Sequence, residues 1–123
     1  MTRAEIRERF IQYRDSIKDK KRNPEDVVDC RIAYMELWNL LLKTECYDWS
    51  FWEHLTRGVY EEAMAGVDTF SFEECCTYLS VIPRTHRLHG SFFWICIENG
   101  SIYKLLSRAI ETLEAEDVKQ TEV

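Results

Sequence analysis

Residues that break helices are scarce in this sequence. Its 123 residues include four glycines and two prolines, and no low-complexity stretch could serve as a flexible linker. No apolar run approaches the ~18 residues of a membrane-spanning helix, and the opening letters MTRAEIRERF lack the apolar core of a secretory signal. We therefore expect a single domain in the cytoplasm, with no part of it in a membrane.

Motifs of catalysis and of metal binding are also missing. The five cysteines are odd in number and include no Cys-x-x-Cys pair, and the chain has no glycine-rich phosphate loop and no His-Glu-x-x-His. Adjacent carboxylates such as Glu73 and Glu74 point apart on a helix, so they make poor acid–base partners. The sequence thus favours a protein that is not an enzyme, binds no cofactor and keeps its cysteines as reduced thiols.

Charge is spread unevenly along the chain, whose formal net charge is −6. Residues 1–22 contain eight basic and four acidic residues, whereas residues 23–82 contain three basic and twelve acidic residues. A basic opening segment and an acidic middle can give the folded protein two different electrostatic faces. Because nucleic-acid-binding domains are usually clearly basic, we consider nucleic acid as a partner but favour a protein.

Helical periodicity dominates the first third of the chain. Thr2 and Glu5 have the spacing of a capping box, which satisfies free amides at a helix start. A helical stripe of apolar residues follows, made of Ile6, Phe10, Tyr13 and Ile17. The segment 24–43 is apolar on most helical faces, which predicts that this helix and the last one form the centre of a bundle. One of its apolar stripes consists of Val28, Ile32, Met35 and Leu42.

Two further capping boxes predict helices in the middle of the chain. Ser50 with Glu53, and Ser71 with Glu74, repeat the spacing in which each side chain can bond the other residue's amide. Pro83 lies twelve positions after Ser71 and should end or kink the helix that starts there, because proline lacks the amide hydrogen that a helix interior needs.

The end of the chain has the clearest helical period. Asn99-Gly100 predicts a turn, after which a last helix begins. Its apolar stripe consists of Ile102, Leu105, Leu106, Ala109, Ile110 and Leu113. The polar segment 116–123 should form a frayed tail, which leaves one helical domain over 1–115.

These patterns together predict an all-α fold, a compact single-domain bundle of five or six helices. The alternative is an α+β fold with a hairpin formed by 77–82 and 92–97, because both apolar runs also suit strands. The letters PRTHRLHGS that join the two runs make a long hairpin loop, so we favour the helical fold.

The same joining stretch contains the most prominent candidate site. Arg84, His86, Arg87 and His89 could bind a phosphate or a carboxylate, since guanidinium groups grip such anions. Free amides of a helix that starts near Gly90 would add to the site. The same residues also suit a solvated helix end whose arginines pair weakly with acidic side chains, and both interpretations stay open.

Metal and thiol chemistry are two further hypotheses for this region. Cys75, Cys76, His86 and His89 are ligand types for zinc, and His-x-x-His places two rings near one helical face. Adjacent cysteines point about 100° apart on a helix, so we favour packed thiols and expect no metal. Cysteine catalysis would require His86 or His54 beside one thiol, and no known signature surrounds either cysteine.

An aromatic cluster, CYDWSFWEHL, lies near the middle of the chain. Aromatic side chains can anchor a binding surface, and they can equally fill the core. We expect Phe51 or Trp52 to face inwards and Trp49 to be the partly exposed member that contacts a partner.

The C-terminal letters PRTHRLHGSFFWICIENGSIYKLLSRAIETLEA resemble the closing segment of a family of small bacterial and phage-borne proteins of unknown function. The residues that match the family's basic positions, glycine, turn and last helix are Arg84, Arg87, Gly90, Glu98, Asn99, Gly100, Ile102, Leu105, Leu106 and Arg108. The chain lacks the family's acidic-aromatic pair near Leu88 and His89. This resemblance implies a compact helical fold and a prokaryotic or phage source, but no activity.

These observations lead us to expect a small acidic intracellular protein that binds or inhibits another protein. One concrete form is an inhibitor of a host defence nuclease complex, such as an anti-CRISPR protein of a phage or mobile element. Its carboxylates would then occupy a nucleic-acid channel. The alternative is an anion- or nucleic-acid-binding module that uses 84–89. A homodimer is also considered, because an apolar helix and four tryptophans can exceed the capacity of one small core.

Overall fold

The computed structural model of the chain describes residues 2–18, 27–47, 62–88 and 92–121. Side chains are described over 2–18, 35–47, 62–83 and 92–116. Within these residues every regular element is a helix, which confirms the all-α prediction. The alternative hairpin is wrong, because 77–82 and 92–97 both lie inside α-helices.

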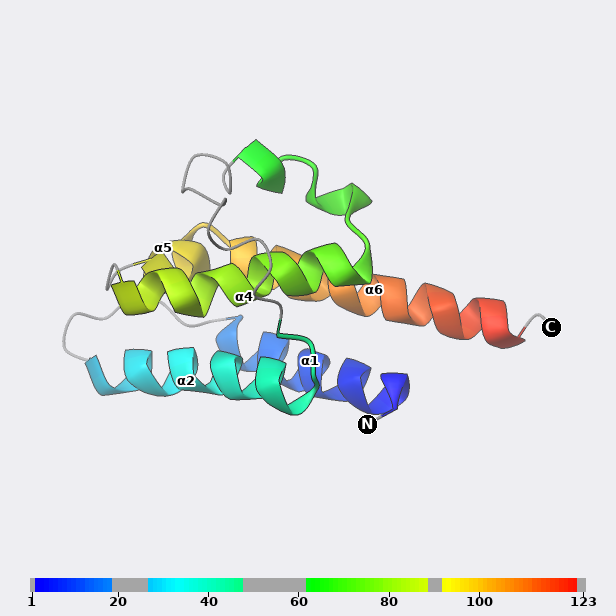
Figure 1. The fold of residues 1–123 in the computed structure, drawn as a ribbon, viewed down its shortest axis with the longest axis horizontal. Helices are drawn as coiled ribbons and strands as arrows, with labels where there is room; N and C mark the ends of the chain where they lie inside the picture. Colours follow the sequence, from blue (N-terminus) through cyan, green and yellow to red (C-terminus); the bar gives the residue numbers. More distant parts are fainter. Residues whose placement is uncertain (1, 19–26, 48–61, 89–91, 122–123) are drawn as a thin grey trace.

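The described residues include five α-helices and one short 3₁₀ helix with defined bounds, and residues 62–64 are also helical. In chain order these are α1 (Arg3–Ile17), α2 (Val27–Lys43), η2 (Val67–Thr69), α4 (Phe72–Leu88), α5 (Phe92–Glu98) and α6 (Ser101–Thr121). In the view of Figure 1, α1 and α2 lie below α4, α5 and α6. No helix among the described residues is long and apolar enough to cross a membrane.

Two of the predicted capping boxes are present at helix starts. The Thr2 hydroxyl accepts a hydrogen bond from the amide of Glu5 at 3.2 Å, which begins α1. At α4, the Ser71 amide donates to the Glu74 carboxylate and the Glu74 amide donates to the Ser71 hydroxyl, both at 3.1 Å. These bonds satisfy amides that have no partner inside the helix, so the local sequence sets where α1 and α4 begin. The box at 50–53 lies outside the described residues.

Burial of apolar stripes holds the bundle together. The six apolar positions predicted for the last helix are all buried in α6, as is the predicted stripe of α1. The rings of Phe10 in α1 and Phe72 in α4 lie 6.0 Å apart. Each large apolar side chain that leaves water contributes about 1.5–3 kcal/mol, so these stripes stabilise the packing of α1 and α4 on α6.

The prediction that α2 and α6 together form the centre is right for α6 only. The main neighbours of α6 are α1, α4, α5 and η2, whereas those of α2 are α1 and α4. Leu37, Leu40 and Leu41 form the buried face of α2, and Met35 and Leu42 are exposed. Buried and exposed leucines therefore occupy opposite faces of α2, because only one face meets α1 and α4.

The sequence predicts that Pro83 ends or kinks its helix, and of these two outcomes the ending is wrong. Pro83 lies inside α4, which continues to Leu88, and its side chain is fully buried beside the equally buried Leu79 and Ile82. Proline in a helix interior costs about 3 kcal/mol, because one backbone bond is lost and the ring crowds the preceding turn. Burial of these apolar neighbours in the core opposes that local cost, so packing overrides the preference of the residue.

The turn predicted at Asn99-Gly100 is confirmed. Gly100 has φ of 77°, a left-handed conformation that favours glycine, and the Ser101 amide donates to the Asn99 side chain at 2.9 Å. Ser101 begins α6, and its hydroxyl donates to the Cys96 carbonyl. The helix continues to Thr121, past the boundary at residue 115 that the sequence suggested.

Candidate functional site

The site residues predicted from sequence lie largely outside the described side chains. Trp49 and His89 fall outside the described residues, and Arg84, His86 and Arg87 are described only as backbone of α4. An anion site at these positions therefore stays a prediction. Within the described residues, no three His, Cys, Asp or Glu side chains come together in a group that could hold a metal ion.

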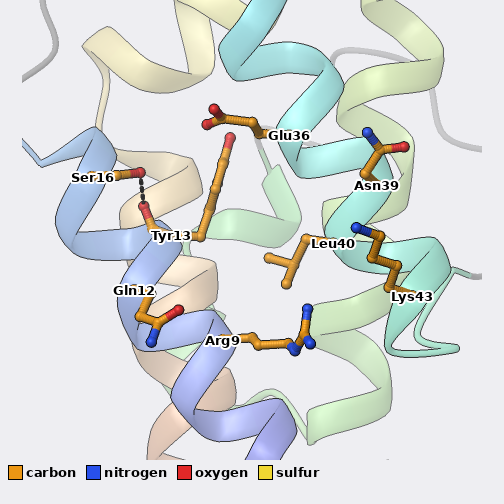
Figure 2. Close-up of a pocket in the computed structure, with 8 residues that line it drawn as sticks. All are labelled: Arg9, Gln12, Tyr13, Ser16, Glu36, Asn39, Leu40 and Lys43. Carbon is orange, nitrogen blue, oxygen red and sulfur yellow. Dashed lines mark hydrogen bonds between the residues drawn. The ribbon is translucent and has the colours of Figure 1, made fainter.

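A groove of about 360 Å³ separates α1 from α2 (Figure 2). The residues that line it are Arg9, Gln12, Tyr13 and Ser16 from α1 and Glu36, Asn39, Leu40 and Lys43 from α2. Tyr13 and Leu40 are buried and form its floor, whereas the polar side chains around them are exposed. The groove is thus an apolar strip with hydrogen-bonding groups along both edges, a common composition for binding sites.

The two ends of this groove differ in charge. Arg9 and Lys43 extend from opposite helices toward Leu40 (Figure 2). Within the described part of the chain, neither cation makes an ion pair. At the other end, Glu36 lies beside the hydroxyl of Tyr13, and burial together with this carboxylate raises the pKa of Tyr13. A carboxylate from a ligand would therefore bind at the Arg9–Lys43 end.

An exposed apolar ridge borders the groove on the outer side of α2. This α2 ridge consists of Met35, Trp38 and Leu42. Met35 and Leu42 are 44% and 49% exposed and, seven residues apart, lie above one another on the helix. Trp38 is half-buried and packs against Tyr47, with ring centroids 5.3 Å apart. Around the axis of α2, Asn39 lies between the ridge and the other residues of the groove. The ridge and the groove therefore form one continuous surface.

A second pocket, of about 280 Å³, lies where the end of α2 meets the start of α4. The residues that line this thiol pocket are Glu45, Cys46, Tyr47, Phe72, Glu73 and Cys76. Its position follows from how α2 ends. Glu45 has φ of 58°, and the Cys46 amide donates to the Leu41 carbonyl at 2.9 Å. These features are typical of a left-handed helix terminus, which turns the chain and directs Cys46 toward α4.

The two thiols of this pocket have opposite character. A hydrogen bond from Cys76, helped by the positive charge of Arg3, lowers the pKa of Cys46 to about 7. The same hydrogen bond and burial raise the pKa of Cys76. Burial also raises the pKa of Cys75, to about 12. Cys46 is therefore the described thiol best able to ionise near neutral pH.

Sequence analysis did not single out Cys46. It lies thirty positions before Cys76, with no motif around it, and no spacing rule links the two cysteines. The one local signal is that Cys46 follows a helix end near Lys43, where a side chain is often accessible. The pairing itself arises only because α2 packs against α4.

Comparison of the chain with protein-family models, with curated proteins and with solved structures finds no match. The resemblance of the C-terminal third to small bacterial and phage proteins therefore stays a prediction. What the protein does has to be inferred from the α2 ridge, the groove and the thiol pocket.

Proposed function

We propose that the protein works by binding another protein, and that the α2 ridge and the adjoining groove form the contact surface. The observation that carries this proposal is the pair Met35 and Leu42, which are both nearly half exposed and share one face of α2. Of the described residues, only Tyr103 is a further large apolar side chain with comparable exposure. Two such side chains at one-face spacing beside a groove are typical of a docking surface.

The partner that fits this surface is an amphipathic segment with apolar residues and a carboxylate. Burial of the exposed parts of Met35 and Leu42 would contribute on the order of 1 kcal/mol each. A carboxylate between Arg9 and Lys43 would form charge-assisted hydrogen bonds, which are about twice as strong as neutral ones. A helix laid along α2 could present both features at i and i+7 spacing.

The experiment is a comparison of matched variants in affinity capture from cells of the native source. Met35→Glu with Leu42→Glu should abolish capture of the partner, because a partner's apolar residues would then face two carboxylates. Tyr103→Glu is the matched control, since it places a carboxylate at the third exposed apolar position, on α6. A partner retained by the double variant, or lost equally with the control, would contradict the ridge as the contact surface.

Arg9→Glu with Lys43→Glu tests the charged half of the surface. We expect weaker binding and a smaller dependence of affinity on salt, because an ion pair with the partner would be lost. Sedimentation of the purified protein decides whether the partner is a second copy of the chain. A dimer that Leu42→Glu dissociates would establish a homodimer, and a monomer would direct the search to other proteins.

We also propose a second form of protein binding, which would use the acidic middle of the chain and not the α2 ridge: a cytoplasmic inhibitor of a host defence nuclease complex, encoded by a phage or mobile element. The acidic middle of the chain and the resemblance of its C-terminal third support this form. A DNA mimic competes with DNA for one channel, so binding to a DNA-free nuclease should exceed binding to the DNA-loaded enzyme. Equal binding to both would contradict the DNA-mimic form.

The alternative proposal is an anion- or nucleic-acid-binding module at 84–89. One observation favours it: α4 is helical through Leu88, so Arg84 and Arg87, three positions apart, share a helical face. Replacement of both arginines by glutamate should abolish co-purification of nucleic acid under this proposal. If the ridge variant loses a protein partner and the arginine variant retains it, the α2 ridge and not 84–89 is the contact surface.

A further inference from the structure

The thiol pocket brings together two cysteines that no sequence motif joins. Cys46 lies just beyond the end of α2, and Cys76 lies in the second turn of α4, which packs against α2. Both line the same pocket, with Tyr47 and Phe72 as its apolar sides. Neither is in a disulfide, so the two form a dithiol.

Exposure and charge distinguish Cys46 from the other described thiols. Cys46 is half-buried, whereas Cys75, Cys76 and Cys96 are buried. Its sulfur donates to the Thr44 carbonyl at 3.4 Å, and the thiol of Cys76 lines the same pocket. A thiol that is accessible and whose thiolate has a donor beside it is the expected nucleophile of a pair.

Arg3 supplies a positive charge near this pocket. Its guanidinium lies over the ring of Phe72, 5.4 Å from the centroid, and forms an ion pair with Glu116 at 3.0 Å. These two contacts join the half-exposed side chain of Arg3 to α4 and α6, beside the pocket that Phe72 lines. Its charge stabilises the thiolate of Cys46.

We propose that Cys46 and Cys76 form a reactive dithiol site that exchanges with small disulfides and closes to an intramolecular disulfide. The ligand class is a low-molecular-weight disulfide, RSSR, which enters the pocket from solvent on the side of Cys46. The site uses other residues and another chemistry than the α2 ridge, and the two meet only where Tyr47 of the pocket packs on Trp38 of the ridge.

The reaction proceeds in two exchange steps. The Cys46 thiol first loses its proton to solvent, and the thiolate attacks one sulfur of RSSR. A Cys46–SR bond forms, the S–S bond of RSSR breaks, and RS⁻ leaves and takes up a proton. The Cys76 thiol then loses its proton and attacks Cys46 sulfur. A Cys46–Cys76 bond forms as the Cys46–SR bond breaks, and the second RS⁻ leaves and takes up a proton, so the protein loses two electrons and two protons that RSSR gains.

The backbone around Cys46 permits the closure. A disulfide requires a sulfur–sulfur distance of about 2.05 Å, so the two free thiols must move together before the bond can form. Cys76 is held in α4, but Cys46 and Tyr47 lie beyond α2 and outside any helix. The approach can therefore come from a shift of Cys46, without unwinding of α4.

The charge of the pocket rim selects among small disulfides. Glu45 and Glu73 are exposed at the pocket, and the nearby Arg3 is already paired with Glu116. The rim is therefore net negative, and a cationic disulfide should react faster than an anionic one. We expect cystamine to exceed oxidised glutathione by roughly threefold or more at low ionic strength, with hydroxyethyl disulfide between them.

The test treats the full chain with each of these three disulfides and maps the products by mass spectrometry. In the wild type we expect loss of two hydrogen atoms and a Cys46–Cys76 linkage in the digest. Cys76→Ser should stop the reaction at the mixed disulfide on Cys46, because the second nucleophile is gone. Cys46→Ser should prevent both products. Cys75→Ser is the control that should behave as the wild type, since Cys75 does not line the pocket.

Three outcomes would overturn the proposal. The first is modification of Cys75 or Cys96 before Cys46, the second is a disulfide other than Cys46–Cys76, and the third is a wild-type mixed disulfide that never resolves. The wild-type digest decides each of them without any variant, so a folding defect in Cys76→Ser would not affect the result. Circular dichroism of each variant identifies such a defect.

Discussion

Replacement of Arg108 by methionine should loosen the connection that positions α4. The Arg108 guanidinium donates through Nε to the carbonyl of Phe70 at 2.9 Å and through Nη1 to Glu111 at 3.4 Å. The first bond joins α6 to the residues between η2 and α4. Phe70 is buried and stacks on Tyr78, with ring centroids 4.8 Å apart. Methionine retains much of the apolar stem but has no donor for the carbonyl.

The magnitude follows from the position of the Arg108–Phe70 hydrogen bond, which is part-buried. A buried acceptor that loses a charged donor costs about 1–3 kcal/mol, so we expect the lower part of this range, and the largely exposed pair with Glu111 contributes about 0–1 kcal/mol. We expect Arg108→Met to lower the free energy of unfolding by an amount in the lower part of the range of about 1–3 kcal/mol in urea titration. For a domain of this size the melting temperature should fall by about 4 °C per kcal/mol.

Glu111→Gln is the matched control for this experiment. It retains the shape of the side chain and removes only the charge of the exposed pair, so its effect should stay below about 1 kcal/mol. An Arg108→Met protein as stable as the wild type would refute the reasoning. A Glu111→Gln protein that loses as much as Arg108→Met would also refute it, because the ion pair and not the Phe70 bond would then dominate.

Three further predictions concern single positions. Leu41→Ala should lower the free energy of unfolding by about 2–5 kcal/mol, because Leu41 is fully buried. The adjacent Leu42→Ala should lower it by less than about 0.5 kcal/mol, because Leu42 is 49% exposed. Urea titration measures both changes. Gly100→Ala should lower the free energy of unfolding by about 1 kcal/mol, because Gly100 has a φ of 77° and no atom lies within 4 Å of the added carbon, so backbone strain is the whole cost. Gly66→Ala should lower it by less. The rate of alkylation of Cys46 should rise with pH around a midpoint near 7, because only the thiolate reacts. A midpoint near the ordinary thiol pKa of about 8.5 would contradict a stabilised thiolate.

The features that sequence analysis predicted correctly are local ones. A capping box such as Ser71 with Glu74 spans four residues, and both of its hydrogen bonds are present at the start of α4. The apolar stripe of α6 is a repeat along one helix, so its buried face could be read without knowledge of the neighbours. The turn at Asn99-Gly100 likewise depends on the conformational freedom of one residue.

The features that it missed depend on which helices become neighbours. The sequence shows that α2 is apolar on most faces, but not that α1 and α4 cover only the face of Leu37 and Leu41. Pro83 has a strong local preference against a helix interior, and only the packing of α4 in the core shows why it is accepted. The pairing of Cys46 with Cys76 is of the same kind, since it joins residues from two separate elements.

Tyr47 connects the two candidate sites and determines which variants can separate them. It lines the thiol pocket, and its ring packs on Trp38 of the α2 ridge. Replacement of Trp38 would therefore change the surroundings of Cys46 as well as the ridge, and a loss of binding could not be assigned to either. Met35 and Leu42 lie on the exposed face of α2 and do not line the thiol pocket. Variants at these two positions should consequently leave disulfide exchange at Cys46 unchanged, so each proposal can fail without the other.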